Sequence, residues 1–368
     1  MKTNDTTEYN KKKIGRFILL FIVLVMVLSN STIREKIFNL VSKDDRTLQV
    51  IKEINIETLN EYQLAVIDNK IIIYSQEGLY RYDFNGNGQP IIQKNLNNSI
   101  ITVDESNIYI ISKDDGQIQT FKSNGDIVWN YNLNRKIDHG FIEGNHLLLI
   151  SMTTEGYQHI TIIDFQGDLK QNIVIKEGQA VLADIFKGGD EVIVGTINNI
   201  EQQIISNLIK YSKEGELLWV ETFENEIIQK VKYLQDRSCI LVTDKKIYHL
   251  SKQKELLWSR KNNEDIWDIK INDDNQTIVV LFRNHLEIID LSGRTKNKIA
   301  LNEEFDKIKY DKNIIYLHNN KSILGIMEKS KFLKYKDNNE IKSIDVTTEN
   351  IIIKLNNKIK IMDIVRTN

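Results

Sequence analysis

Hydrophobic residues recur in short runs from about residue 48 to the C-terminus, separated by Asn, Asp, Gly and Lys, which favour turns. Two such runs in succession, residues 69–75 and 78–83, are typical of a β-hairpin, and this pattern returns seven times. No run has the 3.6-residue period of a helix, so the pattern indicates an all-β fold and argues against parallel βαβ units. The later hairpins are predicted at 107–112 with 117–121, 146–151 with 159–165, 191–196 with 204–211, 238–243 with 246–250, 277–281 with 285–290, 313–318 with 322–327, and 350–355 with 358–363.

The turns that close these hairpins repeat at a nearly constant distance. Successive turns lie 39, 42, 48, 39, 39 and 38 residues apart. A four-stranded β-propeller blade needs roughly 40 to 50 residues. We therefore predict an eight-bladed β-propeller of four-stranded antiparallel blades, or a seven-bladed one if residues 305–336 do not form a separate blade. The turn positions are Gly86, Gly125, Gly167, Gly215, Lys254, Gly293 and Lys331.

The two ends of the repeat region complement each other. The last unit offers only three strands, at 341–346, 351–355 and 358–363, whereas an extra strand at 48–56 precedes the first unit. If this extra strand is the outer strand of the last blade, no open sheet edge remains at the seam. We therefore expect the N-terminal strand to close a ring formed by residues 48–368.

An apolar segment precedes the repeats. Residues 14–28 would span about 22 Å as a helix, and extension to residue 33 brings the segment to the ~30 Å of a membrane core. Lys11, Lys12 and Lys13 precede it, which predicts a cytoplasmic tail (1–13), a single-pass transmembrane anchor (14–33), a spacer (34–47) and an extracytoplasmic propeller. A signal peptide with the same charged start, cleaved to release a secreted protein, is the alternative.

Charge and cysteine content exclude several classes of function. The net charge of the 368 residues is −2, so no large basic surface is available for nucleic acid. Cys239 is the single cysteine, which excludes an intramolecular disulfide. It lies within an apolar run, so we expect a buried thiol.

A tryptophan follows the turn by four residues in three units, at Trp129, Trp219 and Trp258. We expect each of them to fill the same gap between neighbouring sheets. The Gly-x-x-x-Trp motif at 125–129 and 215–219, and its variant at 254–258, resembles the PQQ-type β-propeller repeat of quinoprotein dehydrogenases and related non-enzymatic propellers. With its N-terminal anchor, the whole chain resembles a membrane-anchored PQQ-like-domain family of Firmicutes. This resemblance implies a fold and a topology, but no reaction.

One segment matches the first half of a calcium-binding loop. Asp83, Asn85 and Asn87 are spaced as alternate oxygen ligands, and a glycine follows. The twelfth position is Lys94, where a bidentate glutamate belongs, so a glycine-rich turn is the favoured interpretation and a metal site is the alternative. The six histidines have no metal-ligand spacing.

No catalytic set is recognisable in the repeats. The resemblance to quinoprotein dehydrogenases would imply a calcium site, an aspartate base and often a vicinal cysteine pair, and a single cysteine cannot form that pair. We therefore expect no enzyme activity and no cofactor, and predict a non-catalytic scaffold that binds a protein or an envelope polymer. The alternatives are a quinone-dependent dehydrogenase and an extracytoplasmic ligand sensor that works through a membrane partner.

Overall fold

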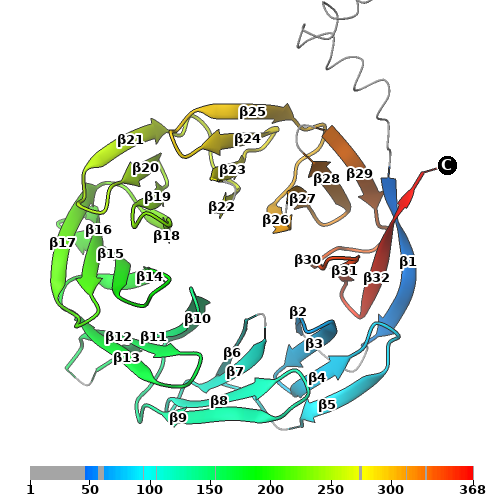
Figure 1. Cartoon of the computed structure of the whole chain (residues 1–368), viewed down its shortest axis with the longest axis horizontal. Helices are drawn as coiled ribbons and strands as arrows, with labels where there is room; N and C mark the ends of the chain where they lie inside the picture. The colour runs from blue at the N-terminus through cyan, green and yellow to red at the C-terminus, as the bar shows by residue number, and fades with distance from the viewer. Residues whose placement is uncertain are drawn as a thin grey trace, which may run out of the picture.

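A computed structural model of the protein describes residues 46–56, 62–93, 95–104, 106–153, 155–272, 276–311, 313–327 and 330–367. Across these ranges the chain consists of β-strands and turns, and it contains no helix long and apolar enough to cross a membrane. The strands are arranged in a ring around an open centre (Figure 1). The predicted cytoplasmic tail, anchor and most of the spacer lie outside the described residues.

Six sheets of the ring have the same design. Each contains four antiparallel strands in sequence order, and the first strand lies nearest the centre (Figure 1). The six sheets are β2 (Gln63–Ile67), β3 (Lys70–Ser75), β4 (Gly78–Tyr82) and β5 (Gly88–Ile92); β6 (Ser99–Val103), β7 (Asn107–Ser112), β8 (Gln117–Lys122) and β9 (Ile127–Asn132); β10 (His139–Glu143), β11 (His146–Met152), β12 (Gln158–Asp164) and β13 (Leu169–Ile175); β14 (Gln179–Ile185), β15 (Glu191–Ile200), β16 (Gln203–Ser212) and β17 (Leu217–Glu224); β18 (Ile228–Tyr233), β19 (Cys239–Thr243), β20 (Lys246–Leu250) and β21 (Leu256–Lys261); and β22 (Asp268–Asn272), β23 (Thr277–Leu281), β24 (His285–Asp290) and β25 (Thr295–Ala300).

The seventh sheet is larger and corrects the predicted blade count. Its eight strands run in the order β26-β27-β28-β29-β1-β32-β31-β30, because β1 pairs in parallel with β29 at Arg46 and Leu333 as well as with β32. The described strands thus form seven sheets, and the prediction of eight separate blades is wrong. Residues 305–336 do not form a separate sheet, and a preceding transmembrane helix is not part of the described fold. The strands are β26 (Lys307–Asp311), β27 (Ile314–His318), β28 (Ser322–Met327), β29 (Ser330–Lys336), β30 (Ser343–Val346), β31 (Asn350–Lys354), β32 (Lys358–Arg366) and β1 (Arg46–Asn55).

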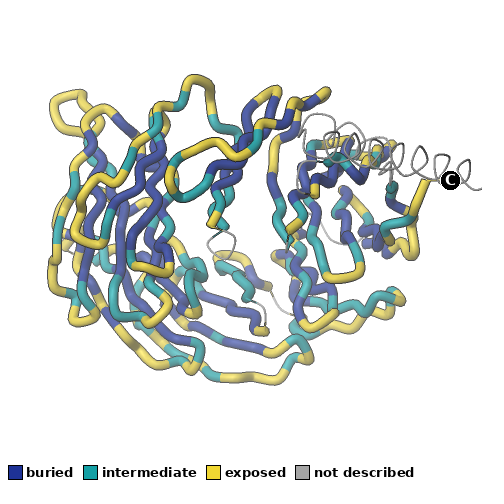
Figure 2. Tube along the Cα trace, turned by 45° about the horizontal axis from the view of Figure 1, so that its top comes forward, coloured by how far each residue is buried: buried dark blue, intermediate teal, exposed yellow. Residues whose placement is uncertain are grey.

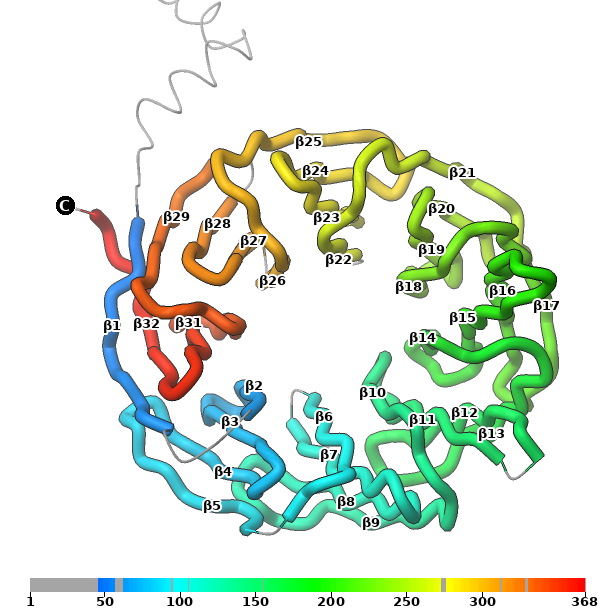
Figure 3. The backbone as a smooth tube through the Cα atoms, turned by 180° about the vertical axis from the view of Figure 1, so that it is seen from behind, coloured from blue at the N-terminus to red at the C-terminus, as the bar shows by residue number. Residues whose placement is uncertain are grey.

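The N-terminal strand closes the ring. β1 runs antiparallel to β32 from the pair Arg46–Arg366 to the pair Asn55–Lys358, with one irregularity after Val50. Its inward side chains, including those of Leu48 and Ile54, are buried. Figure 3 shows β1 between β29 and β32, where the ends of the ring meet. The first strand of the repeat region therefore supplies the outer edge that the last unit lacks.

The hydrophobic core lies between neighbouring sheets. The second strands are buried almost throughout, as in β7, β11 and β19, whereas β9, β17 and β21 on the outside alternate between exposed and half-buried positions. Figure 2 shows the same division, with buried residues along the inner body and exposed residues at turns and on the outer wall. A strand enclosed on both faces needs apolar residues at consecutive positions, which explains runs such as 147–150.

The repeated tryptophans join adjacent sheets. Each indole Nε1–H donates a hydrogen bond to a carbonyl in the turn between the third and fourth strands of the next sheet. This arrangement confirms the predicted structural role. The bonds run from Trp129 to Phe165 O (3.0 Å), from Trp219 to Lys252 O (3.3 Å) and from Trp258 to Leu291 O (2.7 Å).

Two of these turns require glycine for two reasons. Gly167 and Gly293 have φ of +90° and +82°, a region that side chains disfavour. A Cβ atom would also stand 2.8 Å from the Trp129 ring and 2.9 Å from the Trp258 ring, respectively. Lys254 takes the equivalent place in the turn beside Trp219 with φ of 75°, so this repeat carries a side chain where the other two have glycine.

A buried ion pair connects the two halves of the eight-stranded sheet. The Asp337 carboxylate, which follows β29, accepts hydrogen bonds from Lys360 Nζ on β32 (2.7 Å) and from the Tyr335 hydroxyl (2.6 Å). Burial alone would raise the pKa of Asp337, but these hydrogen bonds outweigh it and lower the pKa to about 2. The folded state therefore favours the ionised form of this carboxyl group.

This ion pair predicts a loss of stability in acid. Because the folded pKa lies below the unfolded value near 4, the contribution of Asp337 is complete above pH 4 and disappears as the pH falls towards 2. The shift corresponds to about 2 kcal/mol. Urea unfolding of the native chain and of Asp337→Asn at pH 6 and pH 2.5 should show a smaller acid loss in the variant. Equal acid losses would contradict this assignment.

Candidate functional site

A cavity of about 650 Å³ opens at one end of the ring centre. It is lined by the ends of β14, β18 and β22, by part of β26, and by the turns that follow β14 and β18. These are first strands, so the cavity lies where four inner strands converge. Its size falls within the range of sites that bind small molecules or single side chains, roughly 300–1,000 Å³. We call the end of the ring that carries this cavity the pocket face.

Strand alternation places charged side chains at the pocket. Successive residues of a strand point to opposite sides, so Lys230 and Lys232 share one side of β18 while Val231 and Tyr233 are buried. β22 carries Lys270 beside the buried Ile269 in the same way. The sequence contains this signal, because the first strands of consecutive units carry lysine at alternating positions, but our sequence analysis missed it.

The deepest polar group of the pocket is a buried carboxylate. Asp184 on β14 has no exposed surface, and it accepts backbone N–H bonds from Ile185 (3.0 Å) and Tyr233 (2.6 Å). Lys232 Nζ lies 3.2 Å from Asp184 Oδ1 and 2.8 Å from Glu143 Oε2. Burial raises the pKa of Asp184 to about 6, although Lys232 acts in the opposite direction. The charge of Lys232 is therefore already balanced within the protein.

Other lysines at the pocket form no ion pair with a described carboxylate. Lys270 makes no hydrogen bond or ion pair with any described residue, and the same holds for the exposed Lys187 on the turn after β14. Lys230, beside the pocket, donates to the Ile269 carbonyl (3.0 Å). Burial lowers the pKa of Lys230 and the charge of Lys270 lowers it further, whereas the more distant carboxylates of Asp268 and Glu143 act in the opposite direction. The described part of the pocket thus contains cationic groups that lack a carboxylate partner.

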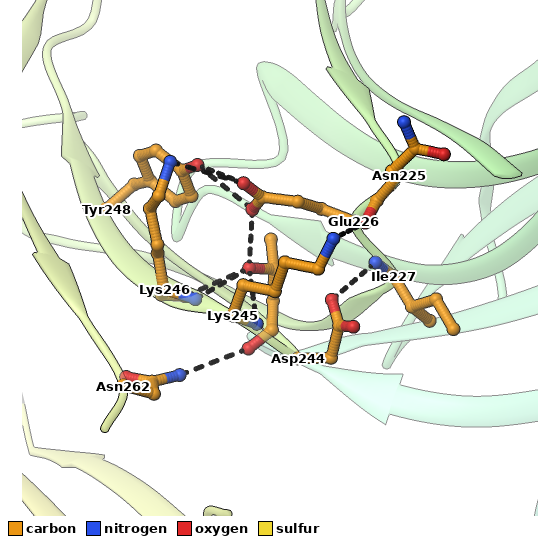
Figure 4. Close-up of polar contacts among 9 residues, drawn as sticks. Asn225, Glu226, Ile227, Asp244, Lys245, Lys246, Tyr248 and Asn262 are labelled. Atoms are coloured by element: carbon orange, nitrogen blue, oxygen red, sulfur yellow. Dashed lines mark hydrogen bonds and ion pairs between the residues drawn. The ribbon is translucent and has the colours of Figure 1, made fainter. Parts of the chain in front are cut away.

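The opposite face of the ring holds a polar cluster that is internally satisfied (Figure 4). The buried Glu226 carboxylate accepts hydrogen bonds from Thr243 Oγ1 (2.7 Å) and the Tyr248 hydroxyl (2.9 Å), and Lys246 Nζ lies 3.3 Å away. Burial would raise the pKa of Glu226, but these contacts lower it. Because both carboxylate oxygens have donors, the cluster fits a structural role between β17 and β20.

The predicted metal residues share one turn between β4 and β5. Asp83 Oδ1 accepts the backbone N–H groups of Asn85 (3.0 Å) and Asn87 (2.8 Å), and Asp83 Oδ2 accepts the Asn87 side-chain amide (2.9 Å). These bonds, led by the side chain of Asn87, lower the pKa of Asp83. The Asp83 carboxylate therefore accepts hydrogen bonds from donors of its own turn. Lys94 lies outside the described residues. The metal site therefore stays a prediction.

Other candidate ligands and nucleophiles are dispersed. Cys239 is a free thiol and is buried, as expected, and burial raises its pKa to about 12. In the described part of the chain, no three His, Cys, Asp or Glu side chains form a group that could hold a metal ion. The buried histidines His146, His249, His285 and His318 belong to four different sheets.

Exposed aliphatic residues recur along the rim of the pocket face. In four consecutive sheets, the side chain at the first residue of the outer strand is between 47% and 60% exposed. These residues are Ile127, Leu169, Leu217 and Leu256. First and third strands of a sheet run in the same direction, so the turns before these residues lie on the pocket face. A series of exposed aliphatic side chains is typical of a contact surface. Three of these residues are followed by another exposed aliphatic residue, namely Val128, Leu218 or Leu257. We call the seven residues together the rim patch.

Comparison with known proteins supports the ring architecture. BamB from Moraxella catarrhalis matches with a TM-score of 0.55 and 9% identity, over 86% of this chain and 99% of its own. Sqt1 from Saccharomyces cerevisiae matches with a TM-score of 0.57 and 8% identity, over 87% of this chain and 98% of its own. The Dos1 propeller matches with a TM-score of 0.59 and 12% identity, over 86% of this chain and 95% of its own. At these identities the likeness shows the fold alone, a β-propeller, as the PQQ-type repeats implied.

Sequence comparison places the chain in a family. No curated protein matches it significantly. A family model described as "Family of unknown function (DUF5711)" matches residues 42–364. The chain therefore belongs to this family.

Proposed function

We propose that this member of the DUF5711 family is a non-catalytic scaffold that binds a partner protein through its pocket face. The observation that carries the proposal is the combination, on one face, of a central cavity and the surrounding rim patch. Protein interfaces commonly join an apolar contact area to a few anchoring pockets. The opposite face offers a polar cluster whose groups are already paired, which favours the pocket face as the contact surface.

The proposal extends to the location of the ring. Residues 14–33 would hold the scaffold at the cell membrane, with the propeller outside the cytoplasm, as in the Firmicutes family that the chain resembles. The apolar run and the preceding Lys11, Lys12 and Lys13 support this location. A carbonate wash of membranes from cells that express the full chain should leave the protein in the pellet, whereas a cleaved and secreted form would appear in the medium.

The scaffold proposal predicts a face-specific loss of binding. Leu217→Ser with Leu218→Ser removes two exposed side chains of the rim patch on β17. Partner recovery in a crosslinked pull-down of the full chain should fall about tenfold, because about 1.4 kcal/mol of apolar contact is lost. Native folding of the variant is checked by its thermal unfolding midpoint.

The same sheet provides the matched control. Ile200→Ser with Ile204→Ser removes two exposed aliphatic residues from the β15–β16 hairpin, whose turn lies on the opposite face. This variant should recover the partner as well as the native chain does. The proposal would be contradicted if the rim variant recovered as much partner as the native chain, or if only the hairpin variant recovered less.

A further inference from the structure

We propose that the cavity on the pocket face binds a carboxylate of an acidic peptide segment that the partner presents. This inference rests on the proposed scaffold function and adds the chemistry of the contact. The side chains around the cavity decide that chemistry, because an imbalance of charge in a partly enclosed site favours a ligand of opposite charge.

The carboxylates around the cavity already accept hydrogen bonds or form ion pairs within the protein. Asp184 and Glu143 both contact Lys232, and Asp184 also serves two backbone N–H groups. On β22, Asp268 accepts the N–H groups of Ile269 (2.8 Å) and of Ile308 in the next sheet (2.8 Å). These acidic groups therefore have partners before any ligand arrives.

The cations that remain point to an anionic ligand. Lys270 and Lys187 line the cavity and form no ion pair with a described carboxylate, and Lys230 donates its described hydrogen bond to a backbone carbonyl. Burial and the neighbouring Lys270 lower the pKa of Lys230, whereas Asp268 and Glu143 raise it, so the two lysines lie close enough for their charges to repel. A ligand carboxylate placed between them would relieve this repulsion and gain charge-assisted hydrogen bonds.

The remaining wall suits a peptide rather than a small inorganic anion. Ile185, Ile271 and Tyr310 give the cavity an apolar side, and Phe186 adds an aromatic ring. Phe186 is held by an edge contact with Tyr233, with ring centroids 5.8 Å apart, and by Arg237 4.4 Å above its ring. A cavity of about 650 Å³ with fixed apolar walls has room for an acidic side chain and its neighbours.

The test compares two peptides and two variants of the full chain. The probes are fluorescent tri-glutamate and tri-glutamine peptides, measured by anisotropy at low salt. The variants are Lys270→Gln, inside the cavity, and Lys213→Gln, which removes an exposed lysine from the same face. Tri-glutamate should bind the native chain and K213Q equally, K270Q about tenfold more weakly, and tri-glutamine should bind none of them.

Several results would overturn the inference. Binding of tri-glutamate by K270Q as tightly as by the native chain would show that Lys270 does not hold the ligand. Displacement of tri-glutamate by an equal concentration of inorganic phosphate would identify a general anion site instead. If the native chain captures its partner but binds no acidic peptide, this inference is overturned and the scaffold proposal still stands. A chain that binds the peptide through Lys270 but captures no partner overturns the scaffold proposal alone.

Discussion

Deletion of residues 46–55, which removes β1, is expected to abolish the monomeric ring. The deletion exposes the edge of β32 and uncovers the buried surface against which Leu48 and Ile54 pack. These two side chains alone contribute about 3–6 kcal/mol, a large share of the 5–15 kcal/mol that is typical of a folded domain. An unpaired strand edge also recruits other chains. Light scattering after size-exclusion chromatography should therefore show aggregates or swapped oligomers.

Deletion of residues 1–45 is the matched control for this experiment. It removes a longer segment but leaves every described strand of the ring in place, so the product should stay monomeric and unfold cooperatively. Identical elution and unfolding midpoints for the two deletions would mean that β1 does not close the ring in solution.

Asp184→Ala is expected to lower the free energy of unfolding by about 3–5 kcal/mol. The substitution leaves Lys232 paired with Glu143 alone and leaves the buried N–H of Tyr233 without an acceptor. A buried N–H that loses its acceptor costs its full desolvation penalty, and Lys232 also loses the more deeply buried of its two carboxylate partners. Urea unfolding followed by tryptophan fluorescence measures the effect.

An exposed aspartate serves as the control for Asp184. The Asp168 side chain is 72% exposed, and Asp168→Ala should change the free energy of unfolding by about 0.5 kcal/mol or less. Asp184→Asn, which keeps one oxygen acceptor, should fall between the two alanine variants. Similar unfolding energies for all three would show that the Asp184 network does not hold β14 to β18.

Most of the fold follows from local patterns in the sequence. Alternating apolar runs, turn residues at a period near 40 and the spare strand at the N-terminus lead to a closed ring of four-stranded units, and the tryptophans occupy the repeated place expected of them. The sheet count does not follow from these patterns. It depends on a single parallel contact between Arg46 and Leu333, residues 287 positions apart, which no local pattern reveals.

The candidate site was less predictable from the sequence. Lys230, Lys232 and Lys270 alternate with apolar residues, but only the three-dimensional structure shows which lysines have carboxylate partners. Leu217 and Leu256 resemble core residues of a strand, and their exposure depends on their place at the start of an outer strand. Asp83, Asn85 and Asn87 were noticed because they match a motif, yet that spacing is also the spacing of a tight turn.

Site-specific photocrosslinking from the two faces of the ring tests the central claim most directly. A photoreactive residue at Gln235, which lines the cavity, is compared with one at Gln203, an exposed position on the opposite face. Both replace an exposed glutamine in the full chain, and both are irradiated in native membranes. The proposed function predicts a discrete crosslinked partner from Gln235 and none from Gln203. A partner crosslinked only from Gln203 would contradict it.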